Sequence, residues 1–274
     1  MIISPGIALL CRLFSLWSRD TKLTECYRAY PMRIKAIARR IPGVKNAWHL
    51  LRQQYTQRRL KDARVDDVFT DIYKNNAWNG AHSLSGPGSD LDQTRVIIQE
   101  LPRLLQDLQV TTLLDIPCGD FHWINQVNLE GLHYQGADIV AELIHNNRKN
   151  YEKENVLFHL MNLLQDDLPQ VDLILCRDCL VHLSHSDIFL ALQNLCRSRS
   201  TYLLATTFTE RDKNDDILTG EWRPLNLEAP PFHLPAPQCL LNEACTEGGG
   251  VYRDKSLGLW SVETIASTLE NSSR

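Results

Sequence analysis

Charged side chains follow the apolar segments of this sequence at the points where those segments end. Asp115 ends the segment 111–116, and the turn Pro117-Cys118-Gly119 comes next. An acidic strand end, a tight turn with a glycine and a helix start form the general plan of a site for an adenosine-containing ligand. A dinucleotide-binding turn needs three glycines at defined steps, and only Gly119 is present. We therefore expect an adenosyl site and disfavour nicotinamide and flavin cofactors.

Two further polar residues follow the next apolar segments. Asp138 lies 23 residues after Asp115, a distance that suits a carboxylate accepting hydrogen bonds from ribose hydroxyls. Asn162 follows the third segment, and its side-chain carbonyl could accept a hydrogen bond from an adenine amino group. Each residue has a structural alternative, since Asp138 could cap a turn or a helix and Asn162 could belong to an ordinary loop.

Arg177 and Asp178 directly follow the fourth apolar segment, 171–176, and His182 lies four residues after Asp178. On a helix, that spacing places the two side chains on one face. An aspartate and a histidine there could orient an acceptor hydroxyl and take its proton, so we single out Asp178 and His182 as candidate catalytic residues. The alternative for His182 is packing against the following helix.

Cys176 and Cys179 have the C-x-x-C spacing of zinc and redox sites. A structural zinc site needs two more ligands at matching spacing, and the sequence holds no second such pair. A redox pair opens a helix in a thioredoxin-like unit, which this context does not resemble. We therefore expect no metal. Eight cysteines among 274 residues are ordinary for a cytoplasmic protein, the location that we expect.

A parallel sheet would bring the polar strand ends together. Near-continuous apolar segments alternate with helical stretches, the segments at 111–116, 132–139, 156–161, 171–176 and 202–208 and the helices at 91–108, 140–150 and 184–197. This pattern predicts an α/β fold with a Rossmann-like, doubly wound, mostly parallel sheet, in which ligands bind outside the carboxyl ends of the strands. Segments 238–246 and 256–264 predict two more strands, paired as an antiparallel hairpin at the sheet edge.

The segment 209–236 is polar and then rich in proline, and it is long for a connection. We interpret it as a lid or a substrate loop. Trp222 and Phe232 could stack on a sugar or another ring, and Arg223 could help to shape an acceptor pocket. The alternative is that these side chains pack the loop onto the sheet.

The net charge of −4 is unevenly distributed. Residues 1–64 hold 14 Lys or Arg against three Asp or Glu, whereas residues 65–274 hold 15 against 30. We expect a basic, helical N-terminal arm joined to an acidic catalytic domain, and the acidic balance argues against a nucleic-acid groove on that domain. The apolar stretch 1–17 is too short and too interrupted to span a bilayer. The arm is either a solvated helix or a peripheral contact with the inner membrane surface.

Several motifs, spread over about residues 67–264, resemble class I S-adenosylmethionine-dependent methyltransferases, and in detail a bacterial subfamily of small methyltransferase-domain proteins. The matching stretches are SGPGS (85–89), LLDIPCGDFHW (113–123), YQGADIV (134–140) and CRDCLVHLS (176–184). Two features depart from the family pattern, the glycine-rich turn and the residue after the third apolar segment. Pro117 and Phe121 stand at places usually held by glycine, and Asn162 stands where an acidic residue is usual.

The resemblance implies S-adenosyl-L-methionine as cofactor, held by three groups of residues. Asp115, Pro117, Cys118 and Gly119 would wrap its methionine part, Asp138 and Ile139 its ribose, and Asn162 and Leu163 would flank its adenine. Arg177 and Asp178 would line the methyl side. The segment with Trp78, Gly86, Gly88 and Ser89 would close over the cofactor.

The function that these observations favour is methyl transfer to a small-molecule or glycan acceptor, with oxygen as the expected nucleophile. An RNA methyltransferase that grips its substrate with the basic arm is an alternative, although we see no Asn-Pro-Pro-Tyr-type motif for amino methylation. A cofactor-binding module without catalysis is another. The sequence does not indicate an oligomeric state.

Overall fold

The computed structural model describes residue 60 and residues 63–272. The basic arm was predicted over 1–64, so its predicted helices and its membrane contact lie almost wholly outside the described residues. Within the part that is described, no helix combines the length and the apolar character needed to cross a bilayer.

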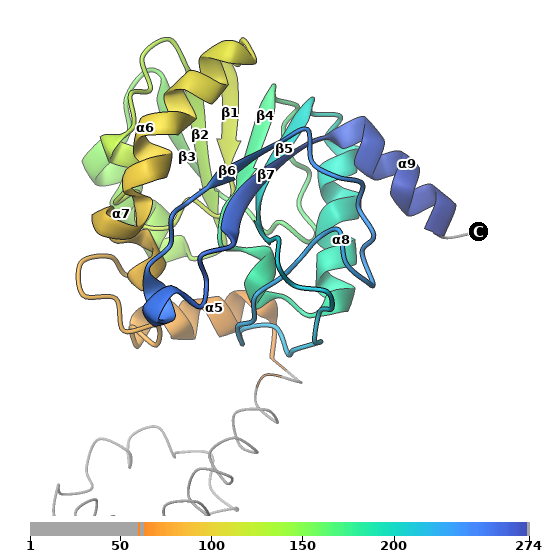
Figure 1. Ribbon diagram of the computed structural model, residues 1–274. Helices are drawn as coiled ribbons and strands as arrows, with labels where there is room; N and C mark the ends of the chain where they lie inside the picture. Colours follow the sequence, from red (N-terminus) through yellow and green to blue (C-terminus); the bar gives the residue numbers. More distant parts are fainter. Residues whose placement is uncertain (1–59, 61–62, 273–274) are drawn as a thin grey trace, which may run out of the picture. The chain divides into compact units, whose positions relative to one another are not determined.

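Seven strands form one sheet in the order β3-β2-β1-β4-β5-β7-β6 (Figure 1). Their bounds are β1 Thr112–Asp115, β2 His133–Asp138, β3 Val156–Leu160, β4 Leu173–Cys176, β5 Tyr202–Phe208, β6 Cys239–Asn242 and β7 Lys255–Ser261. The first five strands pair in parallel, and β7 runs antiparallel to both β5 and β6. This order is that of a doubly wound sheet with its switch point between β1 and β4. The predicted Rossmann-like sheet with an antiparallel C-terminal hairpin is confirmed.

Helices cover both faces of the sheet. Their bounds are α5 Val65–Lys74, α6 Leu91–Asp107, α7 Ala141–Tyr151, α8 His185–Arg197 and α9 Val262–Ser272, with short 3-10 turns η1 Pro87–Ser89, η2 Ile124–Gln126, η3 Leu180–His182 and η4 Glu247–Gly250. Helices α6 and α7 share one apolar core with the sheet, and α8 and α9 share the other. Helix α5 instead lies beyond the carboxyl ends of the parallel strands (Figure 1).

The two cores follow from the alternation of side chains along each strand. Leu113 packs in the core of α6 and α7, whereas its neighbour Leu114 packs in the core of α8 and α9. Leu204 and Leu203 divide in the same way on β5. A strand buried on both faces needs apolar residues at successive positions, which explains the uninterrupted apolar segments of the sequence.

Two elements differ from the prediction. The segment 256–264 was expected to be one strand, but β7 ends at Ser261 and α9 begins at Val262. There, Ser261 Oγ accepts a hydrogen bond from the backbone N–H of Thr264, which is the pattern of an N-cap. Helix α5 was not predicted individually. Its first turn carries Asp66 and Asp67 and its last turn Lys74, a distribution of charge that favours a helix.

Candidate functional site

A pocket opens beyond the carboxyl ends of β1, β2 and β4, at the switch point of the sheet. It encloses about 1090 Å³, counting the space at its mouth. Most of the residues predicted to bind a cofactor line it, namely Trp78, Ser89, Asp115, Pro117, Cys118, Gly119, Asp138, Ile139, Asn162, Leu163, Arg177 and Asp178. His182 lines it as well. The sheet thus gathers residues that lie up to about a hundred positions apart in the chain.

Asp115, at the end of β1, is 2% exposed and lies in the inner part of the pocket. The Tyr134 hydroxyl donates a hydrogen bond of 2.6 Å to its Oδ2 atom. Burial raises the pKa of Asp115 to about 7, although this hydroxyl and the charge of Arg177 oppose the shift. The carboxylate is therefore costly to ionise, and a cation placed beside it would relieve that cost.

Asp138, at the end of β2, joins the turn after β1 to the start of α7. One carboxylate oxygen accepts a hydrogen bond from Gly119 N (3.2 Å) and the other from Val140 N (3.0 Å). Asp138 therefore caps a turn and a helix start, which is the structural alternative to ligand binding that the sequence left open. Each oxygen keeps a second lone pair, so the residue can still accept hydrogen bonds from a ligand. Burial raises the pKa of Asp138 to about 6, even though these backbone donors lower it.

Asn162 lines the pocket, but its side-chain carbonyl already has a donor. The carbonyl accepts a hydrogen bond from Leu164 N (2.9 Å), and Asn162 N donates to Asp166 Oδ2 (2.7 Å). These bonds shape the loop after β3, which is the structural alternative considered from the sequence. The neighbouring Leu163 is buried and offers an apolar wall to the same part of the pocket.

The segment 83–85 is held over the pocket by Asp120, which the sequence analysis did not single out. The Asp120 carboxylate accepts hydrogen bonds from Ser83 Oγ (2.9 Å), Leu84 N (2.8 Å) and Ser85 Oγ (3.3 Å). A Cβ atom on Gly119 would lie 2.2 Å from Ser85 Oγ, and Gly119 has a φ of +56°. Gly119 therefore permits both the left-handed turn and the close approach of this segment.

Gly86 and Gly88 do not line the pocket that the described residues form, so their contact with a ligand stays a prediction. A Cβ on Gly86 would lie 3.2 Å from Trp78 Cβ, so this glycine lets the tryptophan pack against the backbone. The carbonyl of Gly88 accepts a hydrogen bond of 2.8 Å from Arg177 Nη2. The two glycines therefore help to position Trp78 and Arg177, which line the pocket.

Arg177 and Asp178 belong to a buried ionic cluster that also contains Glu243 and Lys255. Arg177 Nη2 lies 2.6 Å from Glu243 Oε2, and Lys255 Nζ lies 2.6 Å from Asp178 Oδ2. Arg177 Nη1 is 3.2 Å from Asp178, and Lys255 is 3.4 Å from Glu243. Two cations and two anions thus neutralise one another. The sequence analysis did not place Glu243 and Lys255 in the site, since only sheet pairing brings the hairpin beside β5, the neighbour of β4.

The cluster makes Asp178 a poor base. Burial alone would raise the pKa of Asp178, but the charges of Arg177 and Lys255 outweigh it and hold that pKa at about 2. Its backbone has a φ of +51°, and its N–H donates to Thr206 Oγ1 (2.8 Å). The helix that would place Asp178 and His182 on one face does not form, and the described segment contains only the turn η3. Both residues nevertheless line the same pocket.

His182 has the geometry of a neutral base. Its Nδ1 atom lies 2.9 Å from the carbonyl oxygen of Glu221, and because a carbonyl can only accept, Nδ1 carries the hydrogen. The lone pair is then on Nε2. Burial lowers the pKa of His182, which keeps the ring uncharged at neutral pH. Trp78 stacks on the imidazole with ring centroids 4.7 Å apart and an angle of 30° between the planes.

The segment 209–236 supports this site from outside. All of its residues are described, and none of them lines the pocket. Phe232 is 1% exposed and packs against His185 and Phe189 in the core. Trp222 is 42% exposed and packs edge-on against Phe208 and Tyr252. Phe232 is therefore packed as the alternative describes, whereas a substrate contact by the exposed Trp222 stays a prediction.

Arg223 is likewise not a pocket residue. Its buried guanidinium donates hydrogen bonds to the carbonyls of Leu180 (3.2 Å), Val181 (3.0 Å) and Leu183 (2.9 Å). These are the carbonyls of η3 and of the residue after it. Arg223 therefore fixes the turn that carries His182, because the N–H groups of its planar guanidinium donate to those three carbonyls.

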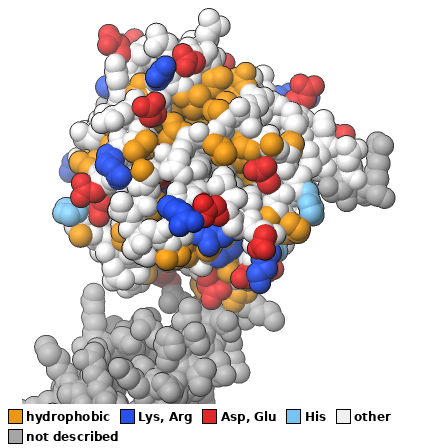
Figure 2. Space-filling view, viewed as in Figure 1, with side chains coloured by type: hydrophobic (Ala, Val, Ile, Leu, Met, Phe, Trp, Pro, Cys, Tyr) orange, Lys and Arg blue, Asp and Glu red, His pale blue; other side chains and the backbone are white. Residues whose placement is uncertain are grey.

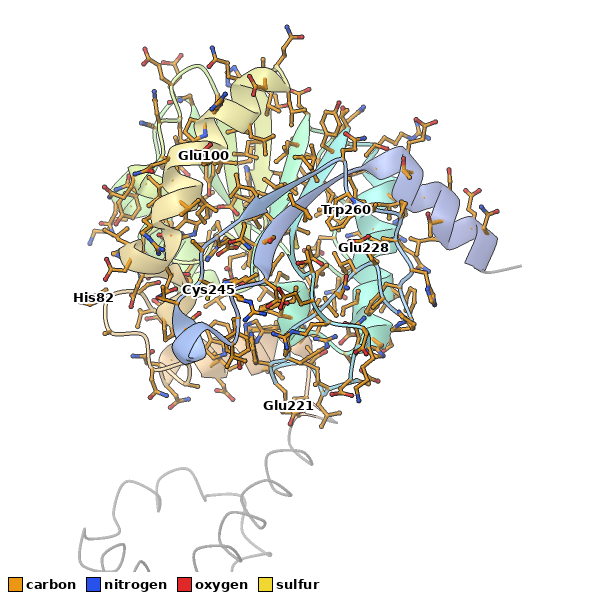
Figure 3. All side chains as sticks on the ribbon, viewed as in Figure 1. His82, Glu100, Glu221, Glu228, Cys245 and Trp260 are labelled. Carbon is orange, nitrogen blue, oxygen red and sulfur yellow. The ribbon has the colours of Figure 1, made fainter. Side chains whose placement is uncertain are left out.

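The outer wall of the pocket comes from α5, which the sequence analysis missed. Val65, Phe69 and Tyr73 recur at four-residue spacing and line the pocket. The next stripe on the helix, Val68 and Ile72, contacts the backbone of Gly220. The four-residue apolar spacing was the signal that could have revealed this helix. Glu221, which follows Gly220, lies at the α5 end of the domain (Figure 3).

Charge and metal-ligand patterns add two observations. On the face shown in Figure 2, Lys and Arg side chains are interspersed with Asp and Glu. In the described part of the chain, no three His, Cys, Asp or Glu residues are grouped so that they could hold a metal ion. Cys176 and Cys179 are both free thiols.

No protein-family model matches the sequence, and a comparison with curated proteins finds no significant match. Solved structures with a similar fold include three methyltransferases. Magnesium protoporphyrin IX methyltransferase from Synechocystis PCC 6803 is 14% identical, with a TM-score of 0.41 over 56% of this chain and 81% of that one. Human N-acetylserotonin methyltransferase is 12% identical, with a TM-score of 0.44 over 72% and 59%. The methyltransferase domain of bacterial CtHen1-C is 13% identical, with a TM-score of 0.38 over 43% and 66%. These are similarities of fold alone.

Proposed function

We propose that this protein is an S-adenosyl-L-methionine-dependent methyltransferase that acts on a hydroxyl group of a small molecule. The observation that carries the proposal is the pair of buried carboxylates, Asp115 and Asp138, at the ends of neighbouring strands in one pocket. The motifs that resemble class I methyltransferases in the sequence fall on the same strand ends.

The chemistry of these residues fits the cofactor. S-adenosyl-L-methionine has a sulfonium and an ammonium group against one carboxylate, so it is a net cation. Asp115 and Asp138 are carboxylates whose pKa values burial has raised, and a bound cation would stabilise their ionised forms. Asp138 also keeps lone pairs for ribose hydroxyls, while Ile139 and Leu163 offer apolar walls to the adenine.

The two departures from the family pattern do not block the pocket. Phe121 stands at a glycine place, but its backbone has a φ of +60° and its ring is 3% exposed. The ring packs with Tyr134, Tyr151 and Phe158, so it is turned into the core. Asn162 replaces an acidic residue and holds its own loop in place.

The residues divide the work of methyl transfer. When bound, S-adenosyl-L-methionine supplies a methyl group whose bond to sulfur breaks, with the electron pair left on sulfur, as the acceptor oxygen forms its new bond. His182 takes the hydroxyl proton on Nε2. The ring then carries the positive charge, because its Nδ1–H stays hydrogen-bonded to the Glu221 carbonyl. Asp178 remains anionic beside it and orients Lys255 and Arg177. Positioning of the two reactants supplies much of the rate.

Calorimetric titration with S-adenosyl-L-methionine tests the proposal, with Asp138→Ala as the variant and Asp107→Ala as the control on an exposed helix end. We expect saturable binding to the wild type, weakened roughly 100-fold in Asp138→Ala because that change removes hydrogen bonds to charged groups. The control should bind like the wild type. A folded wild-type chain that does not bind would refute the methyltransferase function and leave an interaction module that uses the same fold.

A further inference from the structure

We infer that the acceptor is an uncharged, flat, largely apolar molecule with a phenolic hydroxyl, held between α5 and the Trp78–His182 stack. This inference deepens the proposed function and rests on it. It concerns the outer end of the pocket, away from the buried carboxylates Asp115 and Asp138.

The walls of this end are apolar and aromatic. Val65, Phe69 and Tyr73 face it from α5, and Trp78 faces it from the segment that follows. The rings of Phe69 and Trp78 have centroids 6.4 Å apart and are tilted by 56°. All four side chains remain partly exposed in the structure, so they have apolar surface left for a ligand to cover.

Among the described residues, no charged side chain that lines the pocket is left over for an acceptor. The charged lining residues are Asp115, Asp120, Asp138, Arg177 and Asp178. Asp120 is engaged by Ser83 and Ser85, and the ionic cluster with Glu243 and Lys255 neutralises Arg177 and Asp178. The carboxylates at the inner end serve the cofactor. A charged acceptor would therefore bury its charge without a partner, which is costly.

The small number of hydrogen-bonding groups at this end disfavours a glycan. A sugar presents several hydroxyl groups, and each one that is buried needs a hydrogen-bond partner. The outer end offers His182 and the hydroxyl of Tyr73, which already accepts a hydrogen bond from Asn146 Nδ2 (3.3 Å). One reacting hydroxyl can be satisfied there, whereas a ring covered with hydroxyls cannot.

The base selects an acidic hydroxyl. Burial lowers the pKa of His182 below that of an ordinary histidine, so it is a weak base. A phenol has a pKa of about 10, close to that of tyrosine, whereas a water-like hydroxyl has one of roughly 16. Proton transfer to His182 is therefore far less uphill from a phenol than from a sugar or an aliphatic alcohol.

Binding to the protein loaded with S-adenosyl-L-homocysteine tests this inference without turnover. The probes are 2-naphthol, 2-naphthoate, 2-naphthylmethylammonium and methyl β-glucoside, each titrated by calorimetry. We expect saturable binding of 2-naphthol, binding of the two charged analogues weakened roughly tenfold or more, and no saturable binding of the glucoside. A charged analogue or a glucoside that binds as tightly as 2-naphthol would overturn the inference, and so would a loaded protein that does not bind 2-naphthol.

Two variants locate the binding site. Phe69→Ala should weaken 2-naphthol binding roughly tenfold while S-adenosyl-L-homocysteine still binds as in the wild type. Leu190→Ala, an exposed apolar residue of α8 outside the pocket, should change neither. Equal 2-naphthol affinity in the wild type and Phe69→Ala would place the ligand elsewhere. Failure of S-adenosyl-L-homocysteine itself to bind the wild type would refute the proposed function, and the first titration reveals that separately.

Discussion

The two ends of the pocket are built in different ways. At the inner end, Asp115 and Asp138 each directly end a strand, and short turns hold them through bonds such as Gly119 N to Asp138. At the outer end, His182 depends on Glu221 and Arg223, which lie about forty residues further along the chain. The inner end is therefore a property of local turns on a sheet, whereas the outer end exists only when distant segments dock.

This difference has a functional consequence. A cofactor common to many enzymes can be held by a local arrangement that tolerates changes elsewhere. Substitutions in the loop 209–236 and in α5 can alter the outer end while the sheet and its carboxylates stay the same. Variants that disturb one end and spare the other therefore test whether the two ends are as separate as their construction indicates.

The largest effect is expected from Lys255→Met, which removes one cation from the buried cluster. Asp178 and Glu243 would then face each other with only Arg177 between them, at a cost of about 3–5 kcal/mol in the free energy of unfolding. Urea denaturation measures this loss in the free energy of unfolding. Lys213→Met, at an exposed ion pair, should cost less than about 1 kcal/mol. Similar losses for both variants would show that the cluster does not hold the hairpin to β4.

The next effect is the pH dependence of stability measured without cofactor. The pKa of Asp115 is about 7 in the fold and 3.8 in an unfolded chain, so the native state holds more protons between these values. Asp115 should therefore lower the free energy of unfolding by on the order of 3 kcal/mol as pH rises from 4 to 7. Asp138, whose pKa is raised to about 6, adds a smaller slope of the same sign. Asp115→Asn should remove the part that is due to Asp115 and leave the part that is due to Asp138, because a neutral amide still accepts the Tyr134 hydroxyl.

Asp172→Asn is the control for this slope. The pKa of Asp172 is held at about 2 by hydrogen bonds from Thr111 and Thr112, which outweigh burial. Its contribution to stability is therefore lost only below the window from pH 4 to 7. The variant should lower stability evenly across that window and leave the slope intact. A slope that is unchanged in Asp115→Asn would mean that other groups account for all of it.

Arg223→Met separates the two ends most directly. Three carbonyls around η3 lose a side-chain donor, although those of Leu180 and Val181 keep a backbone donor. The change should cost about 2 kcal/mol and reduce kcat by displacing His182. Binding of S-adenosyl-L-methionine should stay within twofold of the wild type. In the wild type, kcat at saturating substrates should rise with pH to a plateau, with a midpoint below 6.5, since the lowered pKa of His182 governs it.

For this variant the control is Arg253→Met, which removes only an exposed ion pair with Glu210. It should match the wild type in kcat and in the pH profile. An Arg223→Met enzyme with normal kcat and a normal acidic limb would show that the loop does not position the base.

The smallest effect is expected from Gly119→Ala, compared with Gly131→Ala. Both glycines have a positive φ, so each change costs about 1 kcal/mol in strain. A Cβ at 119 also collides with Ser85 Oγ, whereas one at 131 meets nothing within 4 Å. Only Gly119→Ala should therefore weaken cofactor binding as well. Equal cofactor affinity in both variants would show that the segment 83–85 is not needed over the cofactor.

Much of the inner end could be predicted from the sequence. Uninterrupted apolar segments specify strands buried on both faces, and the polar residue after each segment must lie at the carboxyl edge of a parallel sheet. The positions of Asp115, Asp138 and Arg177 in one pocket could be predicted in this way. The positions of Gly86 and Gly88 could not, since a motif does not say whether a glycine faces a ligand or lets a neighbour pack.

What the sequence determined by itself is the doubly wound sheet and the carboxylates at its edge, because alternation along a strand and the turn after it are local properties. The tertiary structure alone decided which side chains line the pocket and which are packed elsewhere. Arg223 and Phe232 lie in a loop whose composition suits a substrate contact, but packing buried both of them. Lys255 and Glu243 reach Asp178 and Arg177 only through the pairing of β7 with β5 and with β6. Such contacts join residues far apart in the chain, and their energy depends on burial, which a local pattern does not carry.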